Sequence, residues 1–151
     1  MWLLGSFDRA SWRSVTVFAV YAAIPLAVLY TQARTLDLLA LGEEPARFLG
    51  ADVERAKRLL FLTASLLTAV AVSLAGVIGF VGLVVPHAIR IVTGHLHRSL
   101  LPAAFLLGGV LLVVADAVAR TAFAPLELPV GVVTALIGVP IFVLLVRRWA
   151  S

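Results

Sequence analysis

Apolar residues run without a formal charge from Leu59 to Ile89, and glycines at Gly76, Gly79 and Gly82 followed by Pro86 interrupt the run. A helix that crosses a hydrocarbon core of ~30 Å needs only about 20 residues, so one straight helix cannot account for this run. Glycine and proline remove side-chain bulk and a backbone donor where a chain turns. The pattern therefore predicts two membrane helices joined by a tight hairpin, whose backbone must be shielded by neighbouring helices or a cavity.

The same reading along the whole chain predicts an all-α polytopic membrane protein with about five transmembrane helices in one membrane domain, residues 1–151. The apolar segments are Val15–Thr31, Leu59–Ala75, Val77–Val92, Leu100–Val118 and Val130–Val146. Pro129 and Pro140 bracket the last segment, so we expect a separate short turn over Leu126–Gly131 and a kink near Gly138. Small residues in the last two segments favour close helix packing: Gly108, Gly109, Ala115, Ala119, Gly131, Ala135 and Gly138.

Basic residues are distributed unevenly over the loops between these segments. With five crossings, one side collects nine of them and the other only three. The rich side has Arg34, Arg47, Arg55, Lys57, Arg58, Arg90, Arg98, Arg147 and Arg148, and the poor side has Arg9, Arg13 and Arg120. Because basic loops stay in the cytoplasm, this asymmetry predicts a cytoplasmic C-terminus.

The composition excludes several other classes of protein. Hydrophobic residues make up 62% of the chain and charged residues 13%, with a mean hydropathy of +1.10, which disfavours a soluble domain. The net charge of +4 is dispersed among apolar segments, so nucleic-acid binding is not expected. There is no cysteine for a disulfide or thiolate metal site. The start of the chain lacks the features of a signal peptide and resembles the middle of a longer protein.

Residues 34–58 form the one sizeable polar stretch, and its pattern indicates two short helices at the membrane surface. Leu36, Leu39 and Ala40 recur at helical spacing, and Asp52 resembles an N-cap for a helix that begins near Glu54. Taken alone, such helices either lie on membrane lipid or cover the bundle, or they dock a cytosolic partner. The sequence pattern leaves both readings open.

Ionisable residues next to the apolar segments are the remaining candidates for chemistry. His87 and Arg90, and Asp116 and Arg120, are spaced to interact on one helical face, either as structural pairs or as part of a pathway or gate. The histidines at 87, 95 and 97 do not have the spacing of a metal site. No phosphate-binding loop, nucleophile elbow or metalloprotease motif is present, so we expect no catalytic residue, no metal and no cofactor in this chain.

Three stretches carry a resemblance to a known family. GVIGFVGLVVPHAIRIVTGHLHRSLLPAAFLLGG over Gly76–Gly109, then ADAVART and LELPVGVVTALIGVPIF, resemble the FecCD permease subunits of ABC importers. The resemblance runs from about Trp2 to Arg148 and corresponds to the C-terminal half of a ten-helix bundle. It implies a bacterial cytoplasmic (inner) membrane location, a second permease subunit, cytosolic ATPase subunits, an extracytoplasmic binding protein, and import of iron-siderophores, haem or cobalamin.

The resemblance also assigns roles to residues. Leu39–Gly50 matches the cytoplasmic coupling segment that docks on the ATPase, with Gly42, Glu43, Glu44, Ala46, Arg47, Leu49 and Gly50 as candidate coupling residues. Arg120 matches an outer arginine that meets an acidic residue of the binding protein. Helix-breaking and translocation positions are Gly76, Gly79, Gly82, Pro86, His87, Gly131 and Gly138.

Two alternatives remain beside a transporting permease. The chain could be a remnant that only assembles with other subunits, or a membrane-embedded enzyme or proton relay built on His87, Arg90 and Asp116. Reconstitution without any ATPase would separate the relay from the permease.

Overall fold

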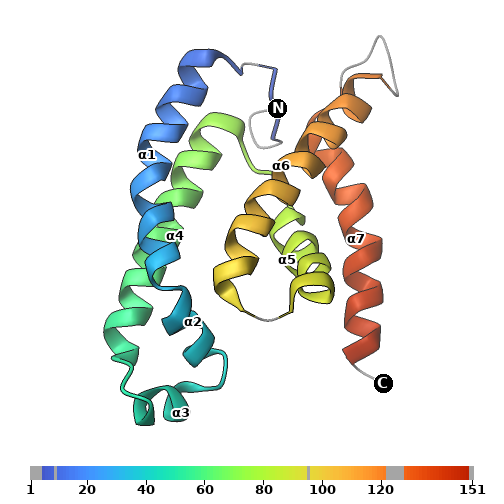
Figure 1. Cartoon of the computed structure of the whole chain (residues 1–151). Coiled ribbons are helices and arrows are strands. Elements are labelled where there is room, and N and C mark those ends of the chain that lie inside the picture. The colour runs from blue at the N-terminus through green and yellow to red at the C-terminus, as the bar shows by residue number, and fades with distance from the viewer. Residues whose placement is uncertain (1–4, 9, 95, 122–127, 150–151) are drawn as a thin grey trace.

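The computed structural model describes residues 5–8, 10–94, 96–121 and 128–149, which form seven α-helices and no strand (Figure 1). They are α1 (Trp12–Thr31), α2 (Ala33–Leu39), α3 (Glu43–Phe48), α4 (Val53–Ala75), α5 (Val81–Thr93), α6 (His97–Thr121) and α7 (Val130–Trp149). Each of the five predicted apolar segments corresponds to one of the longer helices, and the polar stretch holds the two short ones. The all-α prediction is confirmed.

The longer helices are not all of the same length. Three of the described helices, α1, α4 and α6, are long and apolar enough to cross a membrane, whereas the apolar parts of α5 and α7 are shorter. The prediction that the third segment begins at Val77 was wrong, because α5 starts only at Val81. At 13 residues, α5 is about 20 Å long, well short of the hydrocarbon thickness. Pro140 lies inside α7 and not at its end, and residues 126 and 127 of the predicted turn lie outside the described residues.

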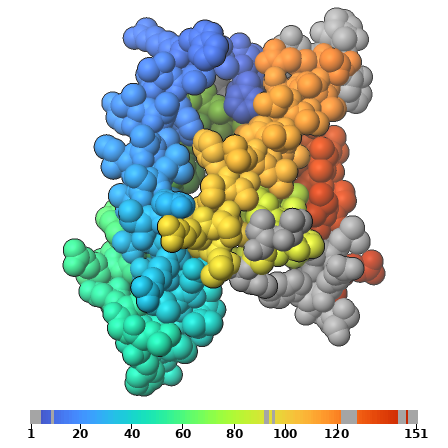
Figure 2. Space-filling view, viewed as in Figure 1, coloured from blue at the N-terminus to red at the C-terminus, as the bar shows by residue number. Residues whose placement is uncertain are grey.

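The helices form two groups. The first is α1 packed along α4, and the second is α5, α6 and α7 packed against one another (Figure 1). The α2–α3 segment, residues 33–48, contacts α6 and α4 and forms the lower tip of the molecule in the space-filling view (Figure 2). The end of α7 lies towards the same end of the bundle as α2 and α3, and the end of α6 lies at the opposite end (Figure 1).

The break between α4 and α5 is shielded by a second piece of non-helical backbone. The N–H of Gly5 donates to Val77 O at 2.9 Å, and the N–H of Ser6 donates to Ala75 O at 2.9 Å. The carbonyl of Gly5 in turn accepts the N–H of Gly131, near the start of α7, at 3.1 Å. This confirms that the polar backbone of the turn lies against neighbouring segments, as burial in an apolar environment requires.

Buried apolar side chains occupy the centre of the second group. One buried cluster is Ala115, Ala119, Val130 and Val133, and another is Val85, Ile89 and Leu100. Gly108, Gly131 and Gly138 are also buried, whereas Gly109 is exposed. Large apolar side chains such as Ile24, Phe61 and Val113 point outward with more than 70% of their surface exposed. Such outward apolar faces are typical of helices that meet lipid or further protein.

Candidate coupling and docking sites

The α2–α3 segment is shaped by two glycines that adopt positive φ. Gly42, at φ +112°, turns the chain between the two short helices, and Gly50, at φ +85°, follows α3. A Cβ added at Gly50 would meet open space, so its backbone conformation, and not crowding, favours glycine there. Ala46 is fully buried and fixes which face of α3 points inward.

The face of α3 opposite Ala46 carries the exposed ring of Phe48, and the exposed side chain of Leu49 follows at the C-cap of the helix. Phe48 has 91% of its surface exposed, and Leu49 has 61%. Leu49 is among the coupling residues predicted from the sequence, and Phe48 is not. The signal was available, because a helical residue two positions after a buried one points away from the buried face. An exposed aromatic ring on a short helix is the type of side chain that anchors protein interfaces.

Two ion pairs join α3 to the start of α4. Arg47 Nη2 lies 3.2 Å from Glu54 Oε1, and Lys57 Nζ pairs with Glu43 Oε1. The hydrogen bond from Lys57 lowers the pKa of Glu43. Because all four side chains are exposed, these pairs orient the segment more than they stabilise it. The side chain of Glu44 has no ion-pair partner among the described residues, which leaves it accessible to another molecule.

Helix α2 is joined to α6 by a pair of residues that the sequence pattern does not predict. Asp37 in α2 accepts a hydrogen bond from the backbone of His97 and contacts its ring. The sequence relates His97 only to His87 and His95, whose spacing does not predict a metal site, and His95 lies outside the described residues. Among the residues that are described, no group of three His, Asp or Glu side chains could hold a metal ion.

At the far end of α6, Arg120 contacts two carboxylates. Its Nε donates to Asp116 Oδ2 at 2.8 Å, which confirms the pair predicted from the spacing of four residues. Its Nη2 lies 3.6 Å from Asp8 Oδ1, a contact with the N-terminal segment that the sequence did not reveal. A cation in the last turn is also favoured by the helix dipole. The side chain keeps 42% of its surface exposed, so a carboxylate from outside could still approach it.

The predicted hinge positions differ in their surroundings. Gly76 ends α4 at φ +73°, whereas a Cβ at Gly79 or Gly82 would meet open space. Pro86 lies inside α5, and the side chain of His87 is half-buried on the same helix. Gly131 lies against the same turn, because a Cβ at this position would lie 3.2 Å from the carbonyl oxygen of Val77 and 3.3 Å from the backbone nitrogen of Gly5.

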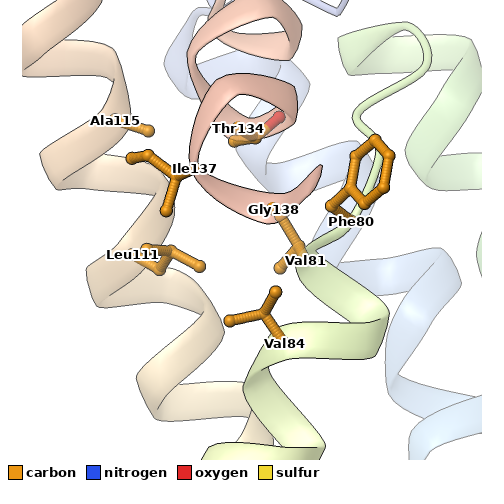
Figure 3. A pocket seen from close by; sticks show the side chains of 8 residues that line it. All are labelled: Phe80, Val81, Val84, Leu111, Ala115, Thr134, Ile137 and Gly138. Carbon is orange, nitrogen blue, oxygen red and sulfur yellow. The ribbon is translucent and has the colours of Figure 1, made fainter. Parts of the chain in front are cut away.

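Gly138 has a close neighbour that the sequence did not suggest. Phe80, which adopts φ +65° just before α5, lies directly over Gly138 on α7 (Figure 3). A Cβ at position 138 would overlap Cβ and Cγ of Phe80. Phe80 and Gly138 line an apolar crevice together with Val81, Val84, Leu111, Ala115, Thr134 and Ile137.

Comparison with known proteins identifies the family of the chain. Residues 1–148 match the sequence model of the FecCD transport family. The chain belongs to the FecCD transport family. It is 52% identical over 147 residues to the cobalamin import system permease protein BtuC of Halobacterium salinarum, covering 97% of this chain and 39% of that protein. It is 48% identical over 149 residues to the hemin transport system permease protein HmuU of Yersinia pestis, covering 98% and 44%.

A third FecCD relative and a solved structure agree with this placement. The Fe(3+) dicitrate transport system permease protein FecD of Escherichia coli is 46% identical over 153 residues, covering 98% of this chain and 46% of that protein. A metal-chelate type ABC transporter solved in an inward-facing conformation superposes with a TM-score of 0.86 at 36% identity, covering 97% of this chain and 47% of that one. The chain therefore spans less than half the length of the family members it matches.

Proposed function

We propose that the chain forms the ATPase-coupling part of a permease in an ABC importer for large metal-containing chelates. The α2–α3 segment docks on a cytosolic ATPase, Arg120 meets the extracytoplasmic binding protein, and a second permease subunit completes the pathway. The relatives are named for cobalamin, hemin and ferric dicitrate, which share only that substrate class. ATP hydrolysis takes place in the partner, and this chain is a transport subunit without catalytic residues.

The observation that carries the proposal is the outward face of α3. Phe48 is exposed on the same face as Glu44 and opposite buried Ala46, and the exposed Leu49 follows at the C-cap of the helix. An apolar anchor surrounded by charged groups is typical of a protein interface. Since α3 is attached to α4 and α2 to α6, a partner that pulls on this face moves both helix groups.

The orientation of the segment is part of the proposal. The predicted cytoplasmic side carries most of the basic residues, and α2, α3 and the end of α7 lie towards one end of the bundle (Figure 1). An ATPase is cytosolic, so this end must face the cytoplasm of the bacterial inner membrane if docking occurs through α3. Arg120, at the other end of α6, then faces outward.

The test is recovery of the ATPase with a tagged permease that contains this chain. We expect Phe48→Ala, and the combined change of Glu43, Glu44 and Arg47 to alanine, to reduce recovery strongly. Phe61→Ala is the matched control, since Phe61 is an equally apolar ring with 74% of its surface exposed, but on the membrane-spanning helix α4. Undiminished recovery with both changes would reject docking through α3.

A further inference from the structure

The pair of Asp37 and His97 links the coupling segment to the longest described helix of the protein. A single carboxylate oxygen, Asp37 Oδ1, accepts the backbone N–H of His97 at 2.8 Å and lies 2.7 Å from Nδ1 of its imidazole ring. The two residues are 60 positions apart in the sequence. His97 keeps 14% of its side chain exposed and Asp37 keeps 27%. One atom therefore fixes both the backbone and the side chain of the first residue of α6.

This attachment is better protected from water than the attachment of α3 to α4. The side chains of the Arg47–Glu54 and Lys57–Glu43 pairs are 45% to 67% exposed. Exposed pairs are screened and contribute little, whereas hydrogen bonds to an ionised carboxylate in a partly buried position are stronger. The N–H of His97 lowers the pKa of Asp37, so the carboxylate is ionised at neutral pH. The firmer connection of the coupling segment is thus the one to α6.

Helix α6 reaches from this pair to the opposite end of the bundle. It has 25 residues, which corresponds to about 37 Å at 1.5 Å per residue. His97 is its first residue, and Arg120 lies in its last turn. The first N–H groups of a helix have no acceptor within the helix, and Asp37 supplies one for His97 from another element. A displacement of α2 therefore acts on the end of α6 directly.

We propose that Asp37 is a positioning residue that transmits movement of the α2–α3 segment to α6, and so connects the ATPase side of the permease with the Arg120 side. The inference rests on the proposed function, because it presumes that α3 docks on the ATPase. It adds a defined route between the two ends: from α3 through the turn at Gly42 to α2, from Asp37 to His97, and along α6. The route predicts that breaking the pair leaves docking intact and impairs communication.

The experiment uses the complete transporter, reconstituted in proteoliposomes with its ATPase and binding protein. Two quantities are measured for each variant: recovery of the ATPase with the permease, and the stimulation of ATP hydrolysis by the binding protein. For Asp37→Ala we expect unchanged recovery and a loss of stimulation of at least about fivefold, the lower range of couplings between sites. Asp37→Asn keeps an acceptor for the N–H of His97 and should retain part of the stimulation. Arg34→Ala, an exposed change on the same short helix, is the control and should behave as the wild type.

A second series separates a transmitting pair from a merely structural one. His97→Ala should also reduce stimulation, and the double change with Asp37→Ala should be no worse than Asp37→Ala alone, because the two side chains act as one unit. His97→Asn, which can still present a donor near the position of Nδ1, should rescue part of the loss.

Each other outcome overturns the proposal in a distinguishable way. Full stimulation in Asp37→Ala would show that α6 receives no signal through this pair, with docking through α3 unaffected. Loss of ATPase recovery in Asp37→Ala would show that the pair only holds the docking segment in shape. Additive losses in the double variant would show that the two residues act separately. Failure of the wild-type permease to retain any ATPase would reject the proposed function itself.

Discussion

Replacing Gly138 by alanine tests the packing of α7 against the α4–α5 connection. The added Cβ would overlap Cβ and Cγ of Phe80 and lie 3.1 Å from its Cδ1. Carbon atoms pack at about 3.5–4.0 Å, and Cβ of Phe80 cannot rotate away because it is bonded to the backbone. Helix α7 or the turn must therefore move. Inserting a methyl group into a well-packed site typically costs about 1–3 kcal/mol.

The assay is the free energy of unfolding in detergent micelles, followed by the loss of helical circular dichroism during denaturant titration. Gly109→Ala is the matched control: it lies in helix α6, and a Cβ there would meet open space. The control should be neutral or stabilising by at most about 1 kcal/mol, since alanine favours helix over glycine. Adding Phe80→Gly to Gly138→Ala should recover stability, because it removes both the overlap and the strained φ of Phe80. Equal stability of the Gly138 and Gly109 variants would refute the reasoning.

Three further outcomes are expected. Because the chain has no cysteine of its own, a cysteine introduced as Glu44→Cys or as Thr121→Cys can be labelled alone. A membrane-impermeant maleimide should label Thr121→Cys from outside the cell, and Glu44→Cys only after the cytoplasmic side is opened. Labelling of both variants from the same side would contradict the predicted topology. Arg120→Ala should slow association with the binding protein and flatten its salt dependence, as measured by stopped-flow mixing, whereas a change confined to the dissociation rate would argue against electrostatic steering. Because the pKa of Asp37 is lowered in the folded protein, its ionised carboxylate stabilises the fold at any pH above its ordinary pKa of 3.8. This contribution to the free energy of unfolding is lost as the pH falls through the lowered pKa. Unfolding at pH 7 and pH 3 should show this loss in the wild type, and it should be reduced in Asp37→Asn.

The crevice between α5, α6 and α7 shows how a broken helix is accommodated. Phe80 adopts a left-handed conformation that is unfavourable for a bulky residue, and it remains there because its ring packs over Gly138. The position is part of the connection that separates α4 from the short helix α5. Backbone strain of this kind is often found in segments that change conformation, and the Gly138 variants test whether packing over Gly138 maintains it.

The sequence by itself determined the number and type of the long helices, because apolar periodicity and segment length depend only on residues near one another in the chain. For the same reason it correctly placed the pair of Asp116 and Arg120, which is separated by one helical turn. It also marked residues 76–82 as a break, since glycine and proline act locally. The family resemblance rests on the same local motifs.

Only the tertiary structure decided which distant segments meet. Asp37 reaches His97, Asp8 reaches Arg120, and Phe80 covers Gly138, although none of these pairs is close in sequence. The sequence also did not predict that α5 begins only at Val81, because a hydrogen bond from Gly5 holds the turn before this helix. Such contacts depend on how preformed helices pack, and packing is fixed by the combined shape of many side chains. A local pattern carries no information about the partner on the other side of the contact.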